Sequence, residues 1–164
     1  MLLRIARHLV TTATRTRRLF NPAVCERIET AITVAEQQHR GEIRFAVETA
    51  LSMPLLWRGL TPRGRALQLF AQLHVWDTEA NNGVLIYVLR ADRAIEIVAD
   101  RGISARVGDG EWQSLCGEAE ARFRTGLFAD GALAAIDGVA RVLGRHFPRQ
   151  DPRPNELPNQ PVLL

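Results

Sequence analysis

The sequence predicts an α/β protein, specifically an α/β/α sandwich in which helices cover both faces of a small mixed sheet. Residues 84–89 form an unbroken apolar run, which is typical of a strand buried on both faces. Residues 95–99 follow a short polar connection and repeat at the two-residue period of a strand, so the two segments predict an antiparallel hairpin. A strand at 42–49 is separated from this hairpin by a helix, and such a crossover places helices against the sheet.

The elements in the first half of the chain follow from turn and capping residues. An Asn-Pro pair opens a helix over residues 21–39, because Asn caps a helix and Pro fits its first turn. Gly41 ends the helical pattern, and residues 42–49 then alternate as a strand. Residues 50–60 are apolar but irregular, so we expect a connection there. A Thr-Pro pair then opens a second helix over residues 61–74.

Two helices and a tail complete the chain. Asp109 can cap a third helix, Gly126 interrupts the apolar pattern, and a fourth helix ends near Phe147. The last residues contain four prolines and predict a disordered or extended tail. The predicted organisation is therefore a basic amphipathic N-terminal arm at 1–20, an α/β domain at 21–148 and a Pro-rich tail at 149–164.

Charge is distributed unevenly along the 164 residues. All 21 basic residues are arginine. The arm at 1–20 holds five of them and no acid, whereas the remainder holds 16 arginines and 18 acids. The overall charge of +3 therefore describes a basic arm on a slightly acidic domain, which is not the charge pattern of a nucleic-acid-binding domain. A nucleic acid partner is not expected.

The N-terminal arm allows two interpretations. Leu2, Ile5 and Leu9 can form an apolar stripe on one side of a helix. The arm can pack on the domain as a helix, or it can attach weakly to an anionic membrane surface. The apolar core of a signal peptide is missing, so the expected location is cytoplasmic, either free or peripheral to a membrane. The residues expected to contact lipid are the five arginines of the arm, Arg4, Arg7, Arg15, Arg17 and Arg18.

Several short motifs resemble the TPM domain family. Asn82-Gly83 precedes the first hairpin strand, Asp92-Arg93 lies at the turn, and Gly102-Ile103 follows the second strand. Gly41 to Arg44 and Phe123 to Gly126 add to the likeness, which covers roughly residues 21–147. The family includes thylakoid-lumen proteins, an auxiliary protein of animal acetylcholine receptors and many bacterial proteins. The resemblance implies an α/β/α sandwich, with weak acid phosphatase activity or divalent-cation binding in some members.

The chain departs from the family pattern at the hairpin base. Relatives usually carry Asp where Asn81 stands and an acid where Ser104 stands, so two expected carboxylates are missing. Asp100 is an acid where relatives commonly have Gly, which replaces them only in part. This loss weakens the expectation of metal-assisted phosphatase chemistry.

A candidate cation site lies at the same hairpin base. Asp77, Glu79 and Asn81 place oxygen-bearing side chains at alternate positions, a spacing that suits Ca²⁺ or Mg²⁺. Asn82 and Asp100 reach the same end if the strands are antiparallel. The expected metal ligands are Asp77, Glu79, Asn82 and Asp100. The alternative is a solvated loop whose polar side chains satisfy turn backbone.

A second candidate site lies at the opposite end of the sheet. Glu48 ends one strand, and Asp92 and Arg93 follow the next strand, so all three lie near the carboxyl ends of strands. Open α/β sheets favour ligands there. The alternative is that Asp92 and Arg93 only form the hairpin turn.

Three functions are compatible with these observations. The first is a TPM-type binding or assembly module for an unknown protein partner, with or without a divalent cation. The second is a weak metal-assisted acid phosphatase, since phosphoryl transfer needs charge neutralisation. The third is a membrane-surface adaptor that uses the basic arm.

Overall fold

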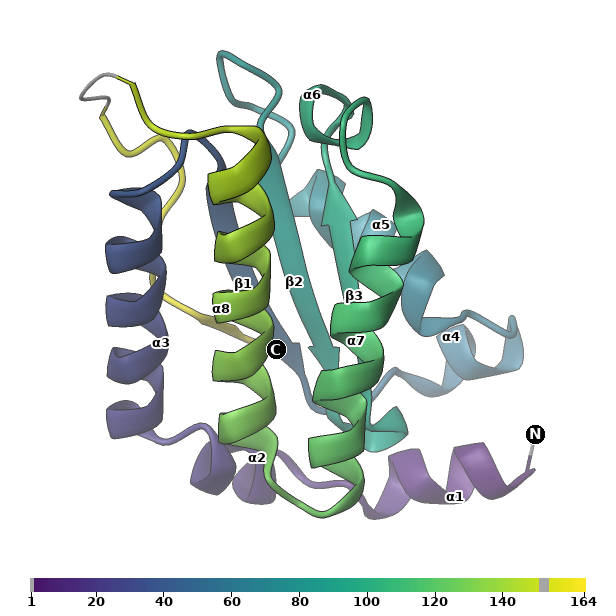
Figure 1. The fold of residues 1–164 in the computed structure, drawn as a ribbon. Coiled ribbons are helices and arrows are strands. Elements are labelled where there is room, and N and C mark those ends of the chain that lie inside the picture. Colours follow the sequence, from purple (N-terminus) through teal and green to yellow (C-terminus); the bar gives the residue numbers. More distant parts are fainter. Residues whose placement is uncertain (1, 151–153) are drawn as a thin grey trace.

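The computed structural model describes residues 2–150 and 154–164 (Figure 1). The order of the described elements is α1 (Leu2–Val10), α2 (Ala13–Leu19), α3 (Pro22–Glu36), β1 (Glu42–Glu48), α4 (Met53–Trp57), α5 (Pro62–Gln72), β2 (Gly83–Leu89), β3 (Ala94–Ala99), α6 (Arg101–Ser104), α7 (Asp109–Arg124), α8 (Phe128–His146) and β4 (Val162–Leu163). A 3-10 turn at Arg90–Asp92 joins β2 to β3.

The sheet confirms the α/β prediction and its mixed topology. In the described part of the chain its strand order is β3-β2-β1-β4. β1 runs parallel to β2, and β2 pairs antiparallel with β3. Ile86 lies opposite Phe45 on one side and Ile97 on the other. Every residue of β2 is buried, as the apolar run predicted, because helices cover both faces of this strand.

Two layers of helices enclose the sheet. α3, α7 and α8 cover one face, whereas α4 and α5 lie behind the other (Figure 1). On the first face Phe45 and Ile86 pack among apolar side chains of α3, α7 and α8. On the second face Leu85 and Tyr87 pack against α4 and α5, with Leu69 among their neighbours. Because side chains alternate between the two faces along each strand, the sheet contributes to two separate apolar cores.

Local sequence signals explain where the helices begin. The Asn21 side chain accepts a hydrogen bond from the Val24 N–H at 3.1 Å, and Thr61 accepts one from Gly64 at 3.0 Å. Both caps are as predicted. The predicted cap at Asp109 is wrong by one residue, since Gly108 is the cap and Asp109 is the first helical residue. An acid in the first turn still stabilises the helix dipole.

Two segments contain structure that the sequence did not predict. Residues 50–60 were expected to be irregular, yet they contain α4, capped at Ser52 with Pro in its first turn. Residues 154–164 of the tail are extended, which is one of the two predicted alternatives, and residues 151–153 lie outside the described residues. β4 pairs parallel with β1, opposite Ala46 and Val47. The exposed edge of β1 offers unpaired backbone groups, and this short apolar segment satisfies some of them.

Candidate functional site

Glu48, at the carboxyl end of β1, is enclosed in a hydrogen-bonded network. The Tyr87 hydroxyl donates to Glu48 Oε2 at 2.6 Å. Arg65 from α5 binds both carboxylate oxygens, with N–O distances of 2.9 and 3.0 Å. Burial together with the Glu48 carboxylate raises the pKa of Tyr87 well above its usual range. Glu48 is therefore a satisfied structural carboxylate, and none of its oxygens lacks a partner.

Asp92 forms a second network in the hairpin turn. Arg4 of α1 donates from Nε to Asp92 Oδ2 at 2.9 Å, and the Arg4 Nη2 atom lies 2.8 Å from the same oxygen. His8 Nε2 lies 3.1 Å from Asp92 Oδ1, and Arg7 approaches at 3.6 Å. Burial would raise the pKa of Asp92, but the hydrogen bonds from Arg4 and His8 and the charge of Arg4 outweigh it and hold the pKa below its ordinary value.

The buried ring of His8 joins this network to the chain after β1. His8 Nδ1 accepts a hydrogen bond from the Leu51 N–H at 3.0 Å. Because a nitrogen that accepts carries no proton, Nε2 bears the N–H and donates it to Asp92. His8 was not recognised as a functional residue from the sequence, since a lone histidine in a basic arm gives no pairing signal.

These contacts dock α1 on the domain by its polar side. Ile5 is half-buried against the core behind the sheet, but the other large apolar side chains of the helix face solvent. The exposed fractions are 85% for Leu2, 78% for Leu3, 65% for Leu9 and 68% for Val10. Packing on the domain, one of the two interpretations of the arm, is therefore realised through Arg4 and His8 and leaves most of the apolar stripe free.

Exposed arginines lie on α1 and on the neighbouring helix α2. Arg7 of α1 and Arg15, Arg17 and Arg18 of α2 are exposed. Both helices lie at the end of the molecule where β1 and β2 finish (Figure 1). We call this surface the basic apolar end; its members are Leu2, Leu3, Arg7, Leu9, Val10, Arg15, Arg17, Arg18, Arg90 and Arg93.

The hairpin turn adds a group of close like charges to the basic apolar end. Burial lowers the pKa of Arg90, and the nearby charges of Arg15 and Arg93 lower it further. The Arg90 Nε and Nη1 atoms are buried and have no hydrogen-bond partner among the described residues. Arg93 is exposed, has a left-handed backbone (φ 53°), and donates to the Arg124 carbonyl at 3.4 Å. Close cations of this kind favour the binding of an anion.

The second predicted site therefore has a different character from the one expected. Glu48 and Asp92 do lie near the carboxyl ends of the strands, but each is held by its own arginine. Arg93 points to α7 rather than to either carboxylate. The three residues do not form one open acidic site, because α1 and α5 supply cations that sequence spacing could not place there.

At the opposite end, the predicted cation ligands are brought together only in part. The Asp100 N–H donates to the Gly83 carbonyl at 2.8 Å, which places Asp100 beside the start of β2 as predicted. Asn82 is buried, whereas Asp77 and Glu79 are exposed. Asn82 Oδ1 and Asp100 Oδ2 are buried without a hydrogen-bond partner in the described part of the chain. Among the described residues, no three His, Cys, Asp or Glu side chains form a group that could hold a metal ion.

The fold and these surfaces define a class of protein: an α/β/α module with a mixed sheet and an accessory basic helix. A family model for the TPM domain matches residues 14–142, and the chain belongs to this family. The matched segment excludes α1 and β4. No curated protein matches the chain. Among the residues described, no helix is both long and apolar enough to cross a membrane.

Two solved structures are similar to the chain. One is the NMR structure of the BA42 protein from the psychrophilic bacterium Bizionia argentinensis, with 30% identity and a TM-score of 0.75. The alignment covers 86% of this chain and 92% of BA42. The other is the N-terminal domain of a protein from P. gingivalis, with 20% identity, a TM-score of 0.64 and coverage of 82% and 83%. The second likeness supports the fold alone.

Proposed function

We propose that this TPM domain is a non-catalytic binding module that docks on an anionic membrane surface through its basic apolar end. The observation that carries the proposal is the orientation of α1, which is fixed to the domain by Arg4 and His8 and exposes Leu2, Leu3, Leu9 and Val10. An amphipathic helix that presents an apolar face beside cations binds the boundary between lipid headgroups and acyl chains.

Charge complementarity selects lipid over a neutral apolar partner. The arm contains no acid, and Arg15, Arg90 and Arg93 repel one another. A phosphate headgroup would relieve this repulsion and accept hydrogen bonds from the exposed side chains of Arg15 and Arg93. Each arginine near an anionic surface contributes about 1 kcal/mol, and burying one leucine contributes about 1.5–3 kcal/mol. The four apolar side chains and the cluster of cations therefore suffice for reversible attachment.

Sedimentation with vesicles tests the proposal. The full chain should bind vesicles that contain phosphatidylserine more tightly than pure phosphatidylcholine vesicles, and added salt should reduce this difference because it screens exposed charges beyond about 8–10 Å. Leu9→Asp should lower the affinity by about tenfold or more. Val34→Asp is the matched control, because Val34 is 49% exposed near the end of α3, at the end of the sheet where β1 begins.

Charge variants test whether vesicle binding depends on the arginines of the basic apolar end. Arg15→Gln should weaken binding to anionic vesicles about fivefold, whereas Arg141→Gln, on α8, should not change it. Equal binding to neutral vesicles, or binding that Leu9→Asp leaves intact, would contradict the proposal. A lipid-independent dimer that Leu9→Asp converts to monomers would show instead that α1 contacts a second copy.

A second candidate function is divalent-cation binding at the hairpin base. It is favoured by the buried, unpartnered oxygens Asn82 Oδ1 and Asp100 Oδ2, which a hard cation would satisfy. Asp77 and Glu79 lie on the exposed loop and form no three-carboxylate group with Asp100 among the described residues, so water would have to supply the remaining ligands. Calcium or magnesium should then raise the melting temperature. Asp100→Asn should remove the rise while still capping α6, since Asn is an equally good cap. Acid phosphatase activity stays a prediction of the family resemblance, and phosphomonoester hydrolysis can be assayed on the same samples.

A further inference from the structure

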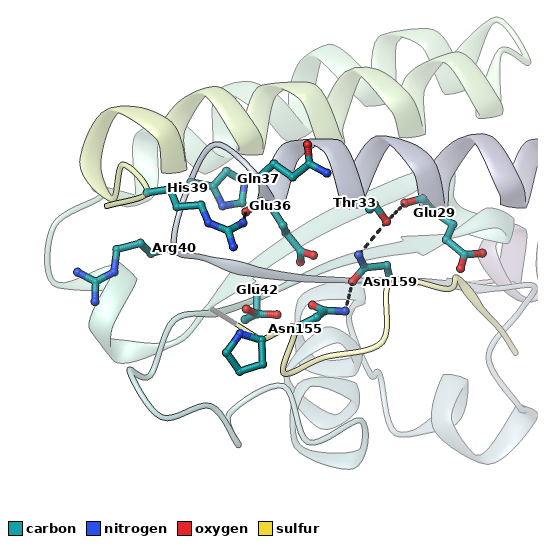
Figure 2. Close-up of a pocket in the computed structure, with 11 residues that line it drawn as sticks. Glu29, Thr33, Glu36, Gln37, His39, Arg40, Glu42, Asn155 and Asn159 are labelled. Atoms are coloured by element: carbon teal, nitrogen blue, oxygen red, sulfur yellow. Dashed lines mark hydrogen bonds between the residues drawn. The ribbon is translucent and has the colours of Figure 1, made fainter. Parts of the chain in front are cut away.

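A polar cavity of about 400 Å³ lies at the amino end of β1, far along the sheet from the basic apolar end (Figure 2). The end of α3, the loop before β1 and the C-terminal segment enclose it. No motif in the sequence indicated this cavity. The side chains that matter for its chemistry are Glu36, His39, Glu42, Arg149, Asn155 and Asn159.

Two glutamate carboxylates line the cavity, one from α3 and one from β1. Glu36 Oε1 accepts the Ile43 N–H at 2.8 Å, and Glu42 Oε2 accepts the N–H groups of Glu156 and Leu157 at 3.2 and 3.3 Å. Burial raises the pKa of Glu36 to about 7 against the Ile43 hydrogen bond, and the charge of Glu42 adds to the rise. Burial also raises the pKa of Glu42. Both anions are therefore incompletely compensated by the protein.

His39 supplies an independent sign of a missing ligand. Its side chain lines the cavity, the residue is only 2% exposed, and neither ring nitrogen has a hydrogen-bond partner of normal geometry among the described residues, although the Gly41 backbone is near enough to act on its pKa. Burial lowers the pKa of His39 to about 4, with the Gly41 backbone opposing the shift and the charge of Arg149 assisting it. The ring is therefore neutral at physiological pH and offers one donor and one acceptor.

The charges around Glu36 leave room for one further cation. The charged or titratable groups that face it are Glu42 of β1, Arg149 after α8 and His39 of the connecting loop, with Glu29 further along α3. Arg149 donates to the Glu36 carbonyl at 2.8 Å and lowers the pKa of both glutamates. Arg40 lines the rim, but Figure 2 shows its side chain pointing away from the two carboxylates. When Glu36 and Glu42 are both ionised, they and Arg149 together carry a net charge of −1, and Glu29 and Glu156 add negative charge nearby.

Hydrogen-bond geometry favours an organic cation over a metal ion. The described residues provide no three-ligand group of His, Cys, Asp and Glu here. A primary ammonium brings three N–H donors of its own, which two carboxylates and an amide oxygen can accept. Asn155 and Asn159 line the cavity, where the Asn155 Nδ2 atom donates to Asn159 Oδ1 at 3.0 Å (Figure 2). The Asn159 side chain also donates a hydrogen bond that lowers the pKa of Glu36, so the amide oxygen offered to a ligand is Asn155 Oδ1. We propose that this cavity binds a small primary amine whose ammonium group is held between Glu36 and Glu42.

The proposal is tested by ¹H–¹⁵N NMR titration of the full chain with n-butylamine. Resonances of Glu36, His39 and Asn159 should shift together in a saturable way, and tetramethylammonium and n-butanol should not reproduce this, because the first lacks N–H donors and the second lacks charge. Glu36→Gln keeps an acceptor for the Ile43 N–H and should weaken binding at least tenfold. Glu118→Gln on the exposed side of α7 is the matched control.

A pH series provides a readout that does not depend on any variant folding. Because the ammonium needs ionised Glu36, affinity should fall about tenfold per pH unit below 7. Saturating n-butylamine should in turn lower the titration midpoint of the Glu36 carboxyl carbon. An unchanged midpoint, equal binding of tetramethylammonium, or cavity shifts with calcium and none with n-butylamine would overturn the proposal.

Discussion

Carboxylates at the two ends of the sheet have different partners and opposite pKa shifts. At the carboxyl end, Glu48 and Asp92 are each paired with an arginine, and Asp92 keeps a low pKa. At the amino end, Glu36 and Glu42 accept hydrogen bonds mainly from backbone N–H groups, and their pKa values are raised. A paired carboxylate is a structural device that fixes another element, here α1 or α5. A carboxylate whose charge the protein compensates only in part can form a favourable interaction with a cationic ligand.

The largest expected effect comes from removing a paired carboxylate. Asp92→Ala would leave Arg4 and the buried His8 without their partner, and we expect it to lower the free energy of unfolding by about 2–4 kcal/mol. Denaturant unfolding measures this loss, and faster proteolysis within residues 2–20 should accompany it because α1 is released. Asp137→Ala breaks only an exposed pair with Arg141 and should cost less than about 0.5 kcal/mol. Equal losses in the two variants would show that Asp92 does not anchor the arm.

The pH dependence of stability should have opposite signs at the two ends. The pKa of Glu36 is raised from 4.5 to about 7, so its contribution is full below pH 4.5 and is lost as pH rises through 7. The pKa of Asp92 is lowered, so its contribution is present above the ordinary pKa and is lost in acid. Glu36→Gln should therefore remove a fall in stability of about 1–3 kcal/mol between pH 5 and 8. Urea titrations of wild type and variant that remain parallel across this range would contradict the assignment.

A smaller loss of stability is expected from removing one hydrogen bond to Glu48. Tyr87→Phe removes the 2.6 Å hydrogen bond but leaves Arg65 on both carboxylate oxygens, so the loss should be about 1 kcal/mol. Thermal unfolding measures it. A loss as large as that of Asp92→Ala would mean that the tyrosine, rather than the arginine, compensates Glu48.

Sequence patterns predicted the layers of the fold better than its edges. The buried strand at β2, the hairpin and the caps at Asn21 and Thr61 follow from local rules, because period and capping act over a few residues. β4 could not be predicted, since Val162 and Leu163 form a strand only because the edge of β1 is available. The pairing of short segments distant in sequence has no local signal.

The candidate sites show the same limit. Glu48 and Asp92 were predicted at the correct end of the sheet. The arginines that pair with them come from α5 and α1, and no local sequence pattern indicates how these two helices pack on the sheet. Arg4 was assigned to lipid, but its side chain pairs with Asp92; Arg7 approaches Asp92 at 3.6 Å with a half-exposed side chain, and its lipid contact stays a prediction. Glu36, His39 and Glu42 were missed because the C-terminal segment, predicted only to be disordered or extended, completes their cavity.

Membrane docking through the basic apolar end is tested most directly by paramagnetic relaxation from lipid. Anionic bicelles doped with nitroxide-labelled lipid should broaden the amide signals of Leu3, Leu9 and Val10, and those of Arg15 and Arg93 less strongly. The signals of His39 and Glu42, at the other end of the sheet, should keep their full intensity. Broadening centred on His39 and Glu42, or uniform broadening over the whole domain, would contradict docking through α1.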